Sequence, residues 1–433
     1  MRLLLKNCIA LTDDGNGGFA RLEPAFVGIT DDTITYLGTA RPAGDWTEKD
    51  LGGAILIPGL VNGHTHAAMT LLRGRGSGLP LHRWLNEAIF PIEDRLTPAD
   101  IAAGNALAQM EMLRTGTTSY SDMYFAEETA AQLCLQSGMK VNLSRPITCF
   151  DDGEHAADST RARESLELFD TWHGKANGRI RVDFAIHAEY TCRERIAREY
   201  AELGAARGAR MHLHLSETQR EHDACKATYG KTPTEWFRDL GVLNLPTGAA
   251  HCVTLEDGDI EILKAYGATA VHNPSSNLKL GSGFMRLKTL LDSGLNVALG
   301  TDGAASNDNL DMLEEMHLAA MIHNGALQDP TAIRAADVLR MATAGGARLQ
   351  GREDTGSIAV GKKADLVAIG PNAPHMLPMF DPVAALAYSV QGSDVCMTMV
   401  DGRVLYENGE YRTIDADRVR YEVQKALGRL YGI

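Results

Sequence analysis

PGLVNGHTH, residues 58–66, is an apolar strand that runs straight into two histidines one residue apart. In an extended strand, residues i and i+2 point to the same side, so the imidazoles of His64 and His66 face one spot. Neutral imidazole is a good ligand for zinc and similar metals. A pair of surface histidines just past a strand would give the same pattern, so the motif alone leaves both interpretations open.

Three further strand ends carry side chains of the metal-binding type. MHLHLSE contains His214, AAHC ends a strand at His251, and VALGTDG ends another at Asp302. Barrel enzymes keep their chemistry at the carboxyl ends of their strands, where all these groups fall. Four strand ends are therefore expected to build one metal site. His212 lies on the same face as His214, one layer deeper, and could equally be a satisfied core residue.

Strand, loop and helix alternate between residues 58 and about 350. Eight apolar strands are predicted, at 55–61, 117–122, 140–146, 181–187, 210–215, 248–251, 268–272 and 296–301. Such alternation is typical of a parallel sheet, and eight repeats favour an α/β fold of the closed (β/α)₈ TIM type. The best-marked helix begins after Thr97 as N-cap and ends at Gly116.

Both ends of the chain are rich in short β-segments with turn residues between them. We expect these ends to pair into one small β-sandwich beside the barrel. The predicted domains are therefore 1–57 and 353–433 for the two parts of the sandwich, and 58–352 for the metal-dependent barrel. Register between distant strands cannot be read from one sequence.

The charge and the cysteines exclude several classes of protein. The 42 Lys+Arg against 56 Asp+Glu give a net charge of −14, and this average field repels nucleic acid and anionic membranes, although it leaves room for a local basic pocket. The seven scattered cysteines form no CxxC pair, so neither disulfides nor a thiolate metal site is indicated. The apolar run of the first residues is too short for a secretory signal, and no uninterrupted apolar stretch of about 18 residues occurs, so we expect neither a signal peptide nor a membrane span. We expect a cytoplasmic protein that binds neither nucleic acid nor membrane.

Glu217 lies three residues beyond His214, where strand turns into loop. A carboxylate so near a metal can move protons, provided that burial keeps its pKa close to neutrality. An exposed loop glutamate is the alternative interpretation.

The sequence closely resembles the amidohydrolase superfamily at these residues. Within it, the chain is similar to the 5′-methylthioadenosine/S-adenosylhomocysteine deaminases, which are near relatives of the triazine hydrolases. The similarity covers nearly the whole chain, and it runs through PGLVNGHTHAAMTLLRG, WLNEAIFPIEDRLTPAD, LAQMEMLRTGTTSYSDMYF, HLHLSETQRE, AAHCV, HNPSSNLKLGSG, LGTDGAASNDNLDMLEEM and GSIAVGKKADLV.

The resemblance implies one divalent metal per subunit, expected to be zinc, and a set of ligands for it. Those ligands are His64, His66, His214 and Asp302. Among the catalytic residues, His251 would contact the metal-bound water, Asp302 would take its proton, and Glu217 would handle the proton at the ring nitrogen beside the amino group.

The resemblance also implies the residues that bind a small-molecule nucleoside. Beside Glu217 and Asp302 these are Trp84, Glu93 on the ribose hydroxyls, His187 at the base or sugar, Ser306 near the ring, and Arg145 and Arg161 toward a carboxylate on the 5′ substituent. Arg163 is two residues from Arg161, so which of the two faces the substrate stays open. Trp84 could be core, Glu93 part of a charge network, and the arginines surface cations. Family members are often homo-oligomers, which is the expectation here.

The implied reaction is hydrolytic deamination of an adenine nucleoside to the inosine analogue and ammonia. 5′-Methylthioadenosine and S-adenosylhomocysteine are the expected substrates, with adenosine and 5′-deoxyadenosine as further options. One alternative is another mononuclear deaminase or hydrolase, for guanine, pterins or triazines. Cyclic-amide hydrolases generally need a bridging lysine at the end of the fourth strand, and RVDFAIHAEY has none. A catalytically inactive binding scaffold would have lost a metal ligand, but every ligand position is occupied.

Overall fold

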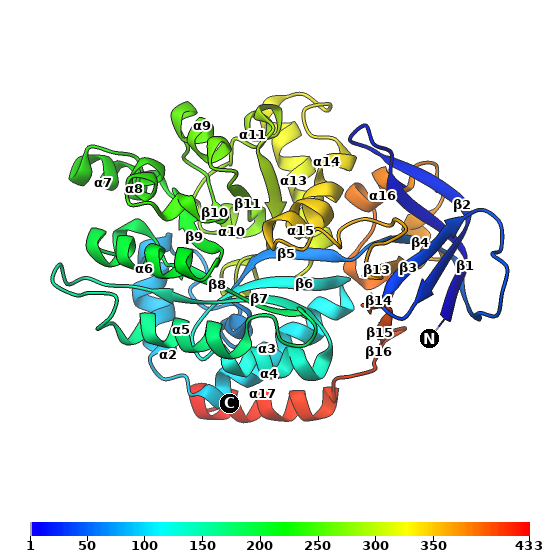
Figure 1. Cartoon of the computed structure of the whole chain (residues 1–433), viewed down its shortest axis with the longest axis horizontal. Helices are drawn as coiled ribbons and strands as arrows, with labels where there is room; N and C mark the ends of the chain where they lie inside the picture. Colours follow the sequence, from blue (N-terminus) through cyan, green and yellow to red (C-terminus); the bar gives the residue numbers. More distant parts are fainter. Residues whose placement is uncertain (1) are drawn as a thin grey trace.

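The computed structural model describes residues 2–433, which form two eight-stranded sheets (Figure 1). All neighbours in one sheet are parallel, in sequence order from β5 to β12. Its strands are β5 (Leu60–Thr65), β6 (Thr117–Met123), β7 (Lys140–Ile147), β8 (Ile180–Ile186), β9 (Met211–Leu215), β10 (Thr247–His251), β11 (Thr269–His272) and β12 (Asn296–Leu299). The predicted (β/α)₈ barrel is confirmed.

The first and last strands of the barrel meet through their polar residues. The amide of Asn62 donates to Thr301 Oγ1 at 2.7 Å, and the backbone N–H of Thr301 donates back to Asn62 Oδ1 at 3.0 Å. The N–H of Asp302 donates to the carbonyl of His64 at 2.9 Å. The barrel therefore closes at its carboxyl end, next to the histidine pair.

Helices surround the barrel between successive strands (Figure 1). The longer ones are α3 (Pro98–Arg114), α4 (Glu128–Ser137), α5 (Thr160–Trp172), α6 (Glu194–Ala206), α7 (Gln219–Tyr229), α8 (Pro233–Asp239), α9 (Asp257–Ala265), α11 (Leu287–Ser293) and α13 (Met312–Leu327). Helix α3 begins as predicted, because Thr97 accepts from the N–H of Asp100 and the Asp100 carboxylate accepts from the N–H of Thr97. It ends before Gly116, whose φ is +91°.

Apart from the last helix, the other helical segments are short and lie in the connections between strands. They are η1 (Ala67–Leu72), α1 (Leu81–Arg83), η2 (Trp84–Ile89), α2 (Phe90–Glu93), η3 (Glu189–Thr191), η4 (Val242–Asn244), α10 (Pro274–Lys279), α12 (Ala304–Asn307), α14 (Ala335–Arg340), η5 (Met341–Gly345), α15 (Gly346–Leu349), η6 (Pro374–Met376), α16 (Pro382–Tyr388) and η7 (Gly392–Asp394). Segments η2 and η5 are π-helical turns.

The second sheet is built from both ends of the chain, as predicted. Its strand order is β16-β15-β14-β13-β4-β1-β2-β3. The strands are β1 (Arg2–Asp13), β2 (Phe19–Thr30), β3 (Thr33–Gly38), β4 (Thr47–Pro58), β13 (Leu366–Ile369), β14 (Val395–Val400), β15 (Arg403–Glu407) and β16 (Glu410–Tyr411). Strand β4 joins the halves, since it pairs with β1 on one side and with β13 on the other.

The prediction of one strand over residues 55–61 was wrong. Ile55–Pro58 is the end of β4, in the terminal sheet, whereas the barrel strand begins at Leu60. The apolar run continues through both strands, so hydrophobicity alone does not mark the division. Gly59 separates them: a Cβ built there would lie 2.2 Å from Thr118 Oγ1, so only glycine lets the chain pass so close to β6.

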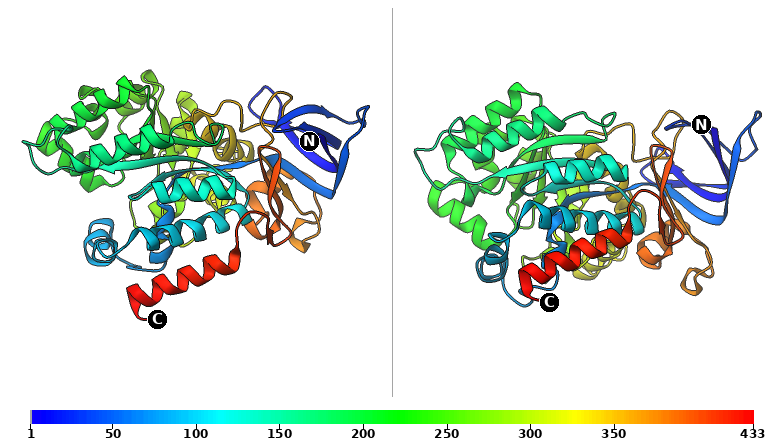
Figure 2. Two further views of the ribbon diagram at one scale, coloured as in Figure 1. Left: turned by 60° about the horizontal axis from the view of Figure 1, so that its bottom comes forward. Right: turned by 90° about the horizontal axis from the view of Figure 1, so that it is seen from below.

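The last helix, α17 (Ala416–Tyr431), lies against the barrel instead of the terminal sheet (Figure 2). Its apolar side, including Val423 and Leu430, belongs to the same buried cluster as Ile101 of α3. The Tyr431 hydroxyl donates to the carbonyl of Leu71, in η1, at 2.9 Å. The C-terminal segment therefore spans both parts of the molecule, and the division at residues 57 and 352 stays a prediction.

The amino end of the barrel is held by a buried arginine. Arg352 is 3% exposed, and its terminal nitrogens donate to the carbonyls of Val141, Gly178 and Arg179 at 2.7–2.9 Å. These carbonyls belong to the entrances of β7 and β8. Burial lowers the pKa of Arg352 to about 10, so the guanidinium is still charged at neutral pH. Within residues 2–433, no helix is long and apolar enough to cross a membrane.

Candidate metal centre and active site

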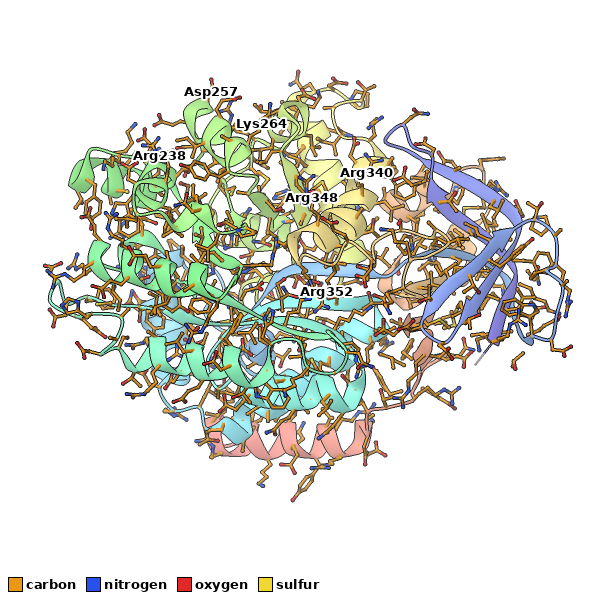
Figure 3. All side chains as sticks on the ribbon, in the orientation of Figure 1. Arg238, Asp257, Lys264, Arg340, Arg348 and Arg352 are labelled. Carbon is orange, nitrogen blue, oxygen red and sulfur yellow. The ribbon has the colours of Figure 1, made fainter. Side chains whose placement is uncertain are left out.

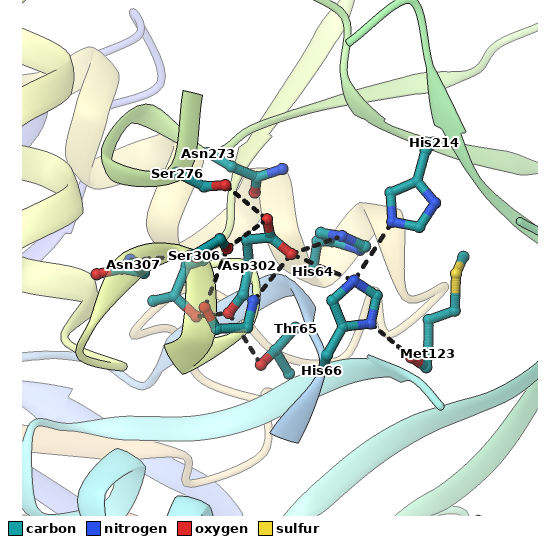
Figure 4. Close-up of polar contacts among 12 residues, drawn as sticks. His64, Thr65, His66, Met123, His214, Asn273, Ser276, Asp302, Ser306 and Asn307 are labelled. Atoms are coloured by element: carbon teal, nitrogen blue, oxygen red, sulfur yellow. Dashed lines mark hydrogen bonds and ion pairs between the residues drawn. The ribbon is translucent and has the colours of Figure 1, made fainter. Parts of the chain in front are cut away.

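The structure brings the predicted ligands together at the carboxyl ends of three barrel strands, β5, β9 and β12 (Figure 4). The Nε2 atoms of His64 and His66 lie 3.4 and 3.2 Å from Asp302 Oδ1. His214 Nε2 lies 3.3 Å from His66 Nε2. Two overlapping groups, His64 with His66 and His214, and His64 with His251 and Asp302, each have ligand atoms within 4.8 Å of one another.

His212 contacts His64 through the ring nitrogen, Nδ1, that does not face the centre. His64 Nδ1 lies 2.8 Å from His212 Nε2, and the two rings are stacked, so His212 supports a ligand from the layer below. Burial lowers the pKa of His64 to about 4, and it lowers that of His212 well below its usual value. Both imidazoles are therefore neutral. His64 Nε2 is buried and has no hydrogen-bond partner in residues 2–433, although it points into the cluster.

The other two histidines are oriented by backbone carbonyls. His66 Nδ1 lies 2.6 Å from the carbonyl of Met123, and His214 Nδ1 lies 2.7 Å from that of His187. Each Nδ1 therefore carries a proton, and each Nε2 is the atom that faces the centre. Burial acts to lower the pKa of His66, but Asp302 outweighs it and raises this pKa to about 9, so a bound metal would take the place of the proton on His66 Nε2. Three converging imidazole lone pairs and one carboxylate fit a single divalent ion of the zinc type.

Asp302 is held from the side opposite the histidines. Its Oδ2 accepts hydrogen bonds from Ser276 at 2.6 Å and Ser306 at 2.8 Å. Burial acts to raise the pKa of Asp302, but the interactions with His64 and His66 outweigh it and hold the pKa well below its usual range. The carboxylate is therefore ionised, with its Oδ1 toward the histidines.

Glu217 and His251 form a second pair beside the ligands. Glu217 Oε2 lies 3.8 Å from His251 Nε2, and Ser282 Oγ lies 3.3 Å from Glu217 Oε1. Burial raises the pKa of Glu217 to about 7, which makes it an acid that can still hold a proton at neutral pH. His251 Nδ1 donates to Asn277 Oδ1 at 2.9 Å. The Glu217 side chain is buried, with 6% of the residue exposed, so the alternative interpretation of an exposed loop glutamate does not apply.

The backbone turns sharply where the site residues leave their strands. Four non-glycine residues there have left-handed φ values: Ser216 at +46°, His251 at +74°, Cys252 at +48° and Asp302 at +60°. Such conformations cost about 1–3 kcal/mol each and persist only where the surroundings enforce them. The strained backbone at the strand ends thus places Glu217, His251 and Asp302 so that their side chains face one point, and the fold is less stable as a result.

Glu93 and Trp84 come from the segment after the first barrel strand. The Tyr124 hydroxyl donates to Glu93 at 2.6 Å, and the Tyr124 ring centre lies 6.4 Å from that of His66. Burial raises the pKa of Glu93. Trp84 is 4% exposed within an apolar cluster, and its Nε1 donates to the carbonyl of Arg75 at 3.1 Å. Glu93 is therefore near the metal centre, whereas the contacts of Trp84 are those of a core residue.

His187 and Ser306 both touch the ligand shell. The ring centre of His187 lies 4.8 Å from that of His214, and burial lowers the pKa of His187 to about 4, so its ring is neutral. Ser306 is 1% exposed and uses its hydroxyl on Asp302. Ser306 thus contacts Asp302, one of the predicted metal-binding residues, directly.

The two arginines differ in their partners. Arg145 Nε donates to Glu164 at 2.8 Å, and its Nη1 donates to the carbonyl of Pro146 at 2.9 Å. Arg161 is exposed in the first turn of α5 and has no hydrogen bond or ion pair in the described part of the chain. Arg163, the other option, donates to Thr160 Oγ1 at 3.2 Å. Of the two options, Arg161 is thus the one whose guanidinium has no partner at all, whereas Arg163 uses one of its five N–H groups.

Three site residues were not singled out in the sequence: Ser276, Asn277 and Ser282. All three lie in the string HNPSSNLKLGSG, but a polar loop residue carries no signal of which ligand it supports. Strand β8 ends at Ile186 and His187 follows, so the fourth strand offers no lysine to bridge a second metal.

The barrel and the site together define a metal-dependent hydrolase of the barrel type. The chain belongs to the amidohydrolase family, whose model matches residues 55–405. The resemblance seen in the motifs is therefore confirmed.

Relatives match along the full length of the chain. It is 42% identical over 432 residues to a 5-methylthioadenosine/S-adenosylhomocysteine deaminase of Caldanaerobacter subterraneus subsp. tengcongensis, covering 99% of each chain. It is 40% identical over 428 residues to a 5′-deoxyadenosine deaminase of Methanosarcina mazei, covering 99% and 98%. Among solved structures, an adenosine deaminase of Xanthomonas campestris with bound zinc superposes with a TM-score of 0.93 at 32% identity, covering 100% and 99%.

Proposed function

We propose that this chain is a hydrolytic deaminase of adenine nucleosides that vary at the 5′ position, and that it releases ammonia and the 6-oxo nucleoside. The observation that carries the proposal is Glu217, a buried carboxyl group with a pKa of about 7 beside the converging histidine nitrogens. Replacing an amino group on a purine ring needs a proton donor for the ring nitrogen. Two relatives are named as deaminases of 5′-modified adenosines, and a similar solved structure is an adenosine deaminase with bound zinc. Both findings agree with this chemistry.

The metal would be one zinc ion held by His64, His66, His214 and Asp302. When bound, it lowers the pKa of coordinated water to about 7 and so supplies a nucleophile at neutral pH. A carboxylate held like Asp302, with one oxygen on two serine hydroxyls, is placed to take the proton of that water.

Glu217 and His251 would act on the substrate side. Glu217 donates its proton to the ring nitrogen beside the amino-bearing carbon, which neutralises the charge that develops there as the C–O bond forms. His251, fixed by Asn277, orients the attacking water. Asp302 then returns its proton to the amino group and the C–N bond breaks, so that ammonia leaves. The C–OH group becomes the carbonyl as its proton passes to Glu217, which restores both carboxyl groups to their starting states.

Substrate binding would extend from the ring to the 5′ substituent. Glu93, half-buried and held by Tyr124, would accept from the ribose hydroxyls. His187 would meet the base or sugar, Ser306 would lie near the ring, and Trp84 would form a wall of the nucleoside pocket from its place in the core.

A carboxylate on the 5′ substituent would be bound by Arg161 together with Arg145. Arg161 has free donors, and Arg145 would have to share its fork with Glu164. Replacing Arg161 with Met should lower kcat/KM for S-adenosylhomocysteine about tenfold or more, because charge-assisted hydrogen bonds contribute roughly 1.5–3 kcal/mol. 5′-Methylthioadenosine lacks the carboxylate and is the internal control. Equal losses on both substrates would assign Arg161 a purely structural role, and Arg163→Met provides the matched variant.

The test of the reaction is ammonia release from a panel of compounds. Adenosine, 5′-deoxyadenosine, 5′-methylthioadenosine and S-adenosylhomocysteine are expected to be deaminated, and guanine and melamine-type compounds are not. Turnover of guanine or melamine alone would move the chain to another mononuclear branch of the family. No turnover of any compound by zinc-loaded protein would favour a binding scaffold.

The proposal also places the protein in the cytoplasm as a homo-oligomer. Its seven cysteines are all free and six of them are buried, as suits a reducing compartment. Light scattering of the purified chain tests the assembly.

A further inference from the structure

A hollow of about 620 Å³ opens at the amino end of β12, far from the metal centre. Its walls come from α11, the entrance of β12 and the continuous helical stretch α14–η5–α15. Asn296 lines the hollow and begins the strand, whereas Asp302 follows the strand's other end. At about 3.3 Å per residue the two lie roughly 20 Å apart. The hollow therefore belongs to the opposite face of the barrel.

The hollow gathers positive charge in an otherwise acidic protein. Four cationic and two acidic side chains line it, in a chain of net charge −14. Both acidic groups already have cationic partners at 2.6 Å: Asp292 holds Lys288, and Asp337 holds Arg334. Neither carboxylate therefore neutralises the two cations that remain.

Those two cations are Arg340 and Arg348, labelled on the same side of the barrel in Figure 3. Neither guanidinium group makes a hydrogen bond or an ion pair among residues 2–433, although the Arg348 carbonyl accepts from Arg210. The turn between β1 and β2 lies against Arg340, since a Cβ at Gly17 would be 3.2 Å from Arg340 Nη1. Asp14 of this turn accepts from the N–H groups of Gly18 and Asn16, and these bonds, with a smaller effect from the nearby charge of Arg340, lower the pKa of Asp14. Both guanidinium groups thus keep their donors free.

A π-helical turn, η5, separates the two arginines along the chain. Such turns are rare and occur frequently at functional sites. Met341 at its start lines the hollow beside Arg340, and Leu291 and Leu295 of the facing wall supply further apolar surface. The hollow therefore combines two free guanidinium groups with an apolar wall.

We propose that this hollow binds a small organic phosphate. The phosphoryl group lies between Arg340 and Arg348, whose planar forks match its oxygens and whose two charges match a dianion. The organic part lies against Leu291, Leu295 and Met341. Pockets for small molecules commonly enclose about 300–1,000 Å³, so the volume suits an organic phosphate better than the bare ion.

The proposal is tested by calorimetric titration of the zinc-loaded enzyme with ribose 5-phosphate at low salt. We expect one molecule bound per chain, weaker binding of inorganic phosphate, and no binding of ribose. Arg340→Met with Arg348→Met should weaken binding at least about tenfold, because each guanidinium supplies charge-assisted hydrogen bonds. Arg348→Met alone, at an exposed position that folding tolerates, should also weaken binding about tenfold.

The matched control is the double variant Arg198→Met with Arg238→Met. These arginines line a smaller hollow of about 390 Å³, in which Arg238 is already paired with Asp239. This variant should bind ribose 5-phosphate like the parent, and both double variants should keep the parent's deaminase rate. Unchanged binding in the Arg340/Arg348 variant would overturn the proposal. So would inorganic phosphate binding as tightly as ribose 5-phosphate, or binding that disappears when the metal is removed.

Discussion

The two ends of the barrel use buried polar groups in opposite ways. At the amino end, Arg352 is buried and both terminal nitrogens donate to backbone oxygens, so polarity there fastens strands together. At the carboxyl end, His64 Nε2 is buried without a partner in the described residues, and His251 and Asp302 have left-handed backbones. One end therefore stabilises the fold, and the other gives up stability to keep groups ready for a ligand.

The first test breaks the carboxyl end alone. His64→Ala removes one of three converging imidazoles, and an open three-ligand set should lose the metal. We expect activity to fall about 10³-fold or more, with the metal content measured by elemental analysis dropping from about one per chain toward zero. His375→Ala, a partly exposed histidine paired with Asp394 near the terminal sheet, should change neither value. Full metal retention in His64→Ala would contradict the assignment.

Glu217→Gln separates chemistry from metal binding at the same end. Gln keeps the shape of the side chain but cannot deliver the proton, so kcat should fall about 10²–10⁴-fold with KM nearly unchanged. Metal content should stay at about one per chain. Glu261→Gln, on the exposed side of α9, is the control. If Glu217→Gln kept most of its activity, another residue would have to protonate the ring.

Arg352→Met tests the amino end, where the loss should appear in stability. The variant leaves the carbonyls of Val141, Gly178 and Arg179 without their donor inside the protein. Removing a buried charged partner costs about 3–5 kcal/mol, which denaturant unfolding measures. The kcat of the folded fraction should match that of the parent, as should both values for exposed Arg195→Met. A lowered kcat with unchanged stability would reverse the contrast between the ends.

Glu315 should make the stability of the folded state depend on pH. It is fully buried in α13, where it accepts from Ser275 N and Asn307 Nδ2, and burial raises its pKa from 4.5 to about 8. Below pH 4.5 the group is protonated in both folded and unfolded chains. As the pH rises toward 8, only the unfolded chain releases the proton, so the folded state loses stability, by about 2–4 kcal/mol.

The matching variant is Glu315→Gln, which cannot titrate. The fall in the free energy of unfolding between pH 5 and pH 8 should be smaller in this variant than in the parent and in Glu261→Gln. The slope is the readout, because a Gln amide facing the Ser275 N–H shifts stability equally at every pH. Identical slopes in parent and variant would show that Glu315 is ionised at neutral pH.

The sequence predicted the barrel and the ligands because both depend on signals with a period. Apolar runs that end in His214, His251 and Asp302 are visible without any tertiary information, since strand ends of a parallel barrel meet at one face. The same signal failed between Ile55 and Val61, where one apolar run serves two sheets and only Gly59 marks the division.

The supporting residues could not be predicted, because their roles arise from contacts between distant segments. His212 contacts His64 because β5 and β9 belong to the same barrel, which the spacing of the two residues in the sequence does not show. Ser276 and Ser306 lie in separate loops and converge on one oxygen of Asp302. The sequence left Arg145 as either a substrate-binding residue or a surface cation, and only the fold shows that Glu164 of α5 lies against it.

Closure of the barrel between His64 and Asp302 has a consequence for the order of events during synthesis. At about 5–20 residues per second, the ribosome delivers Asp302 roughly 10–50 s after His64. The pairing of β4 with β13 can form only later still, because β13 begins at Leu366. The nascent chain thus carries two histidines of the site without the rest of the donor set. The full donor set therefore exists only once Asp302 has been delivered, and we expect metal added to the finished chain to load it.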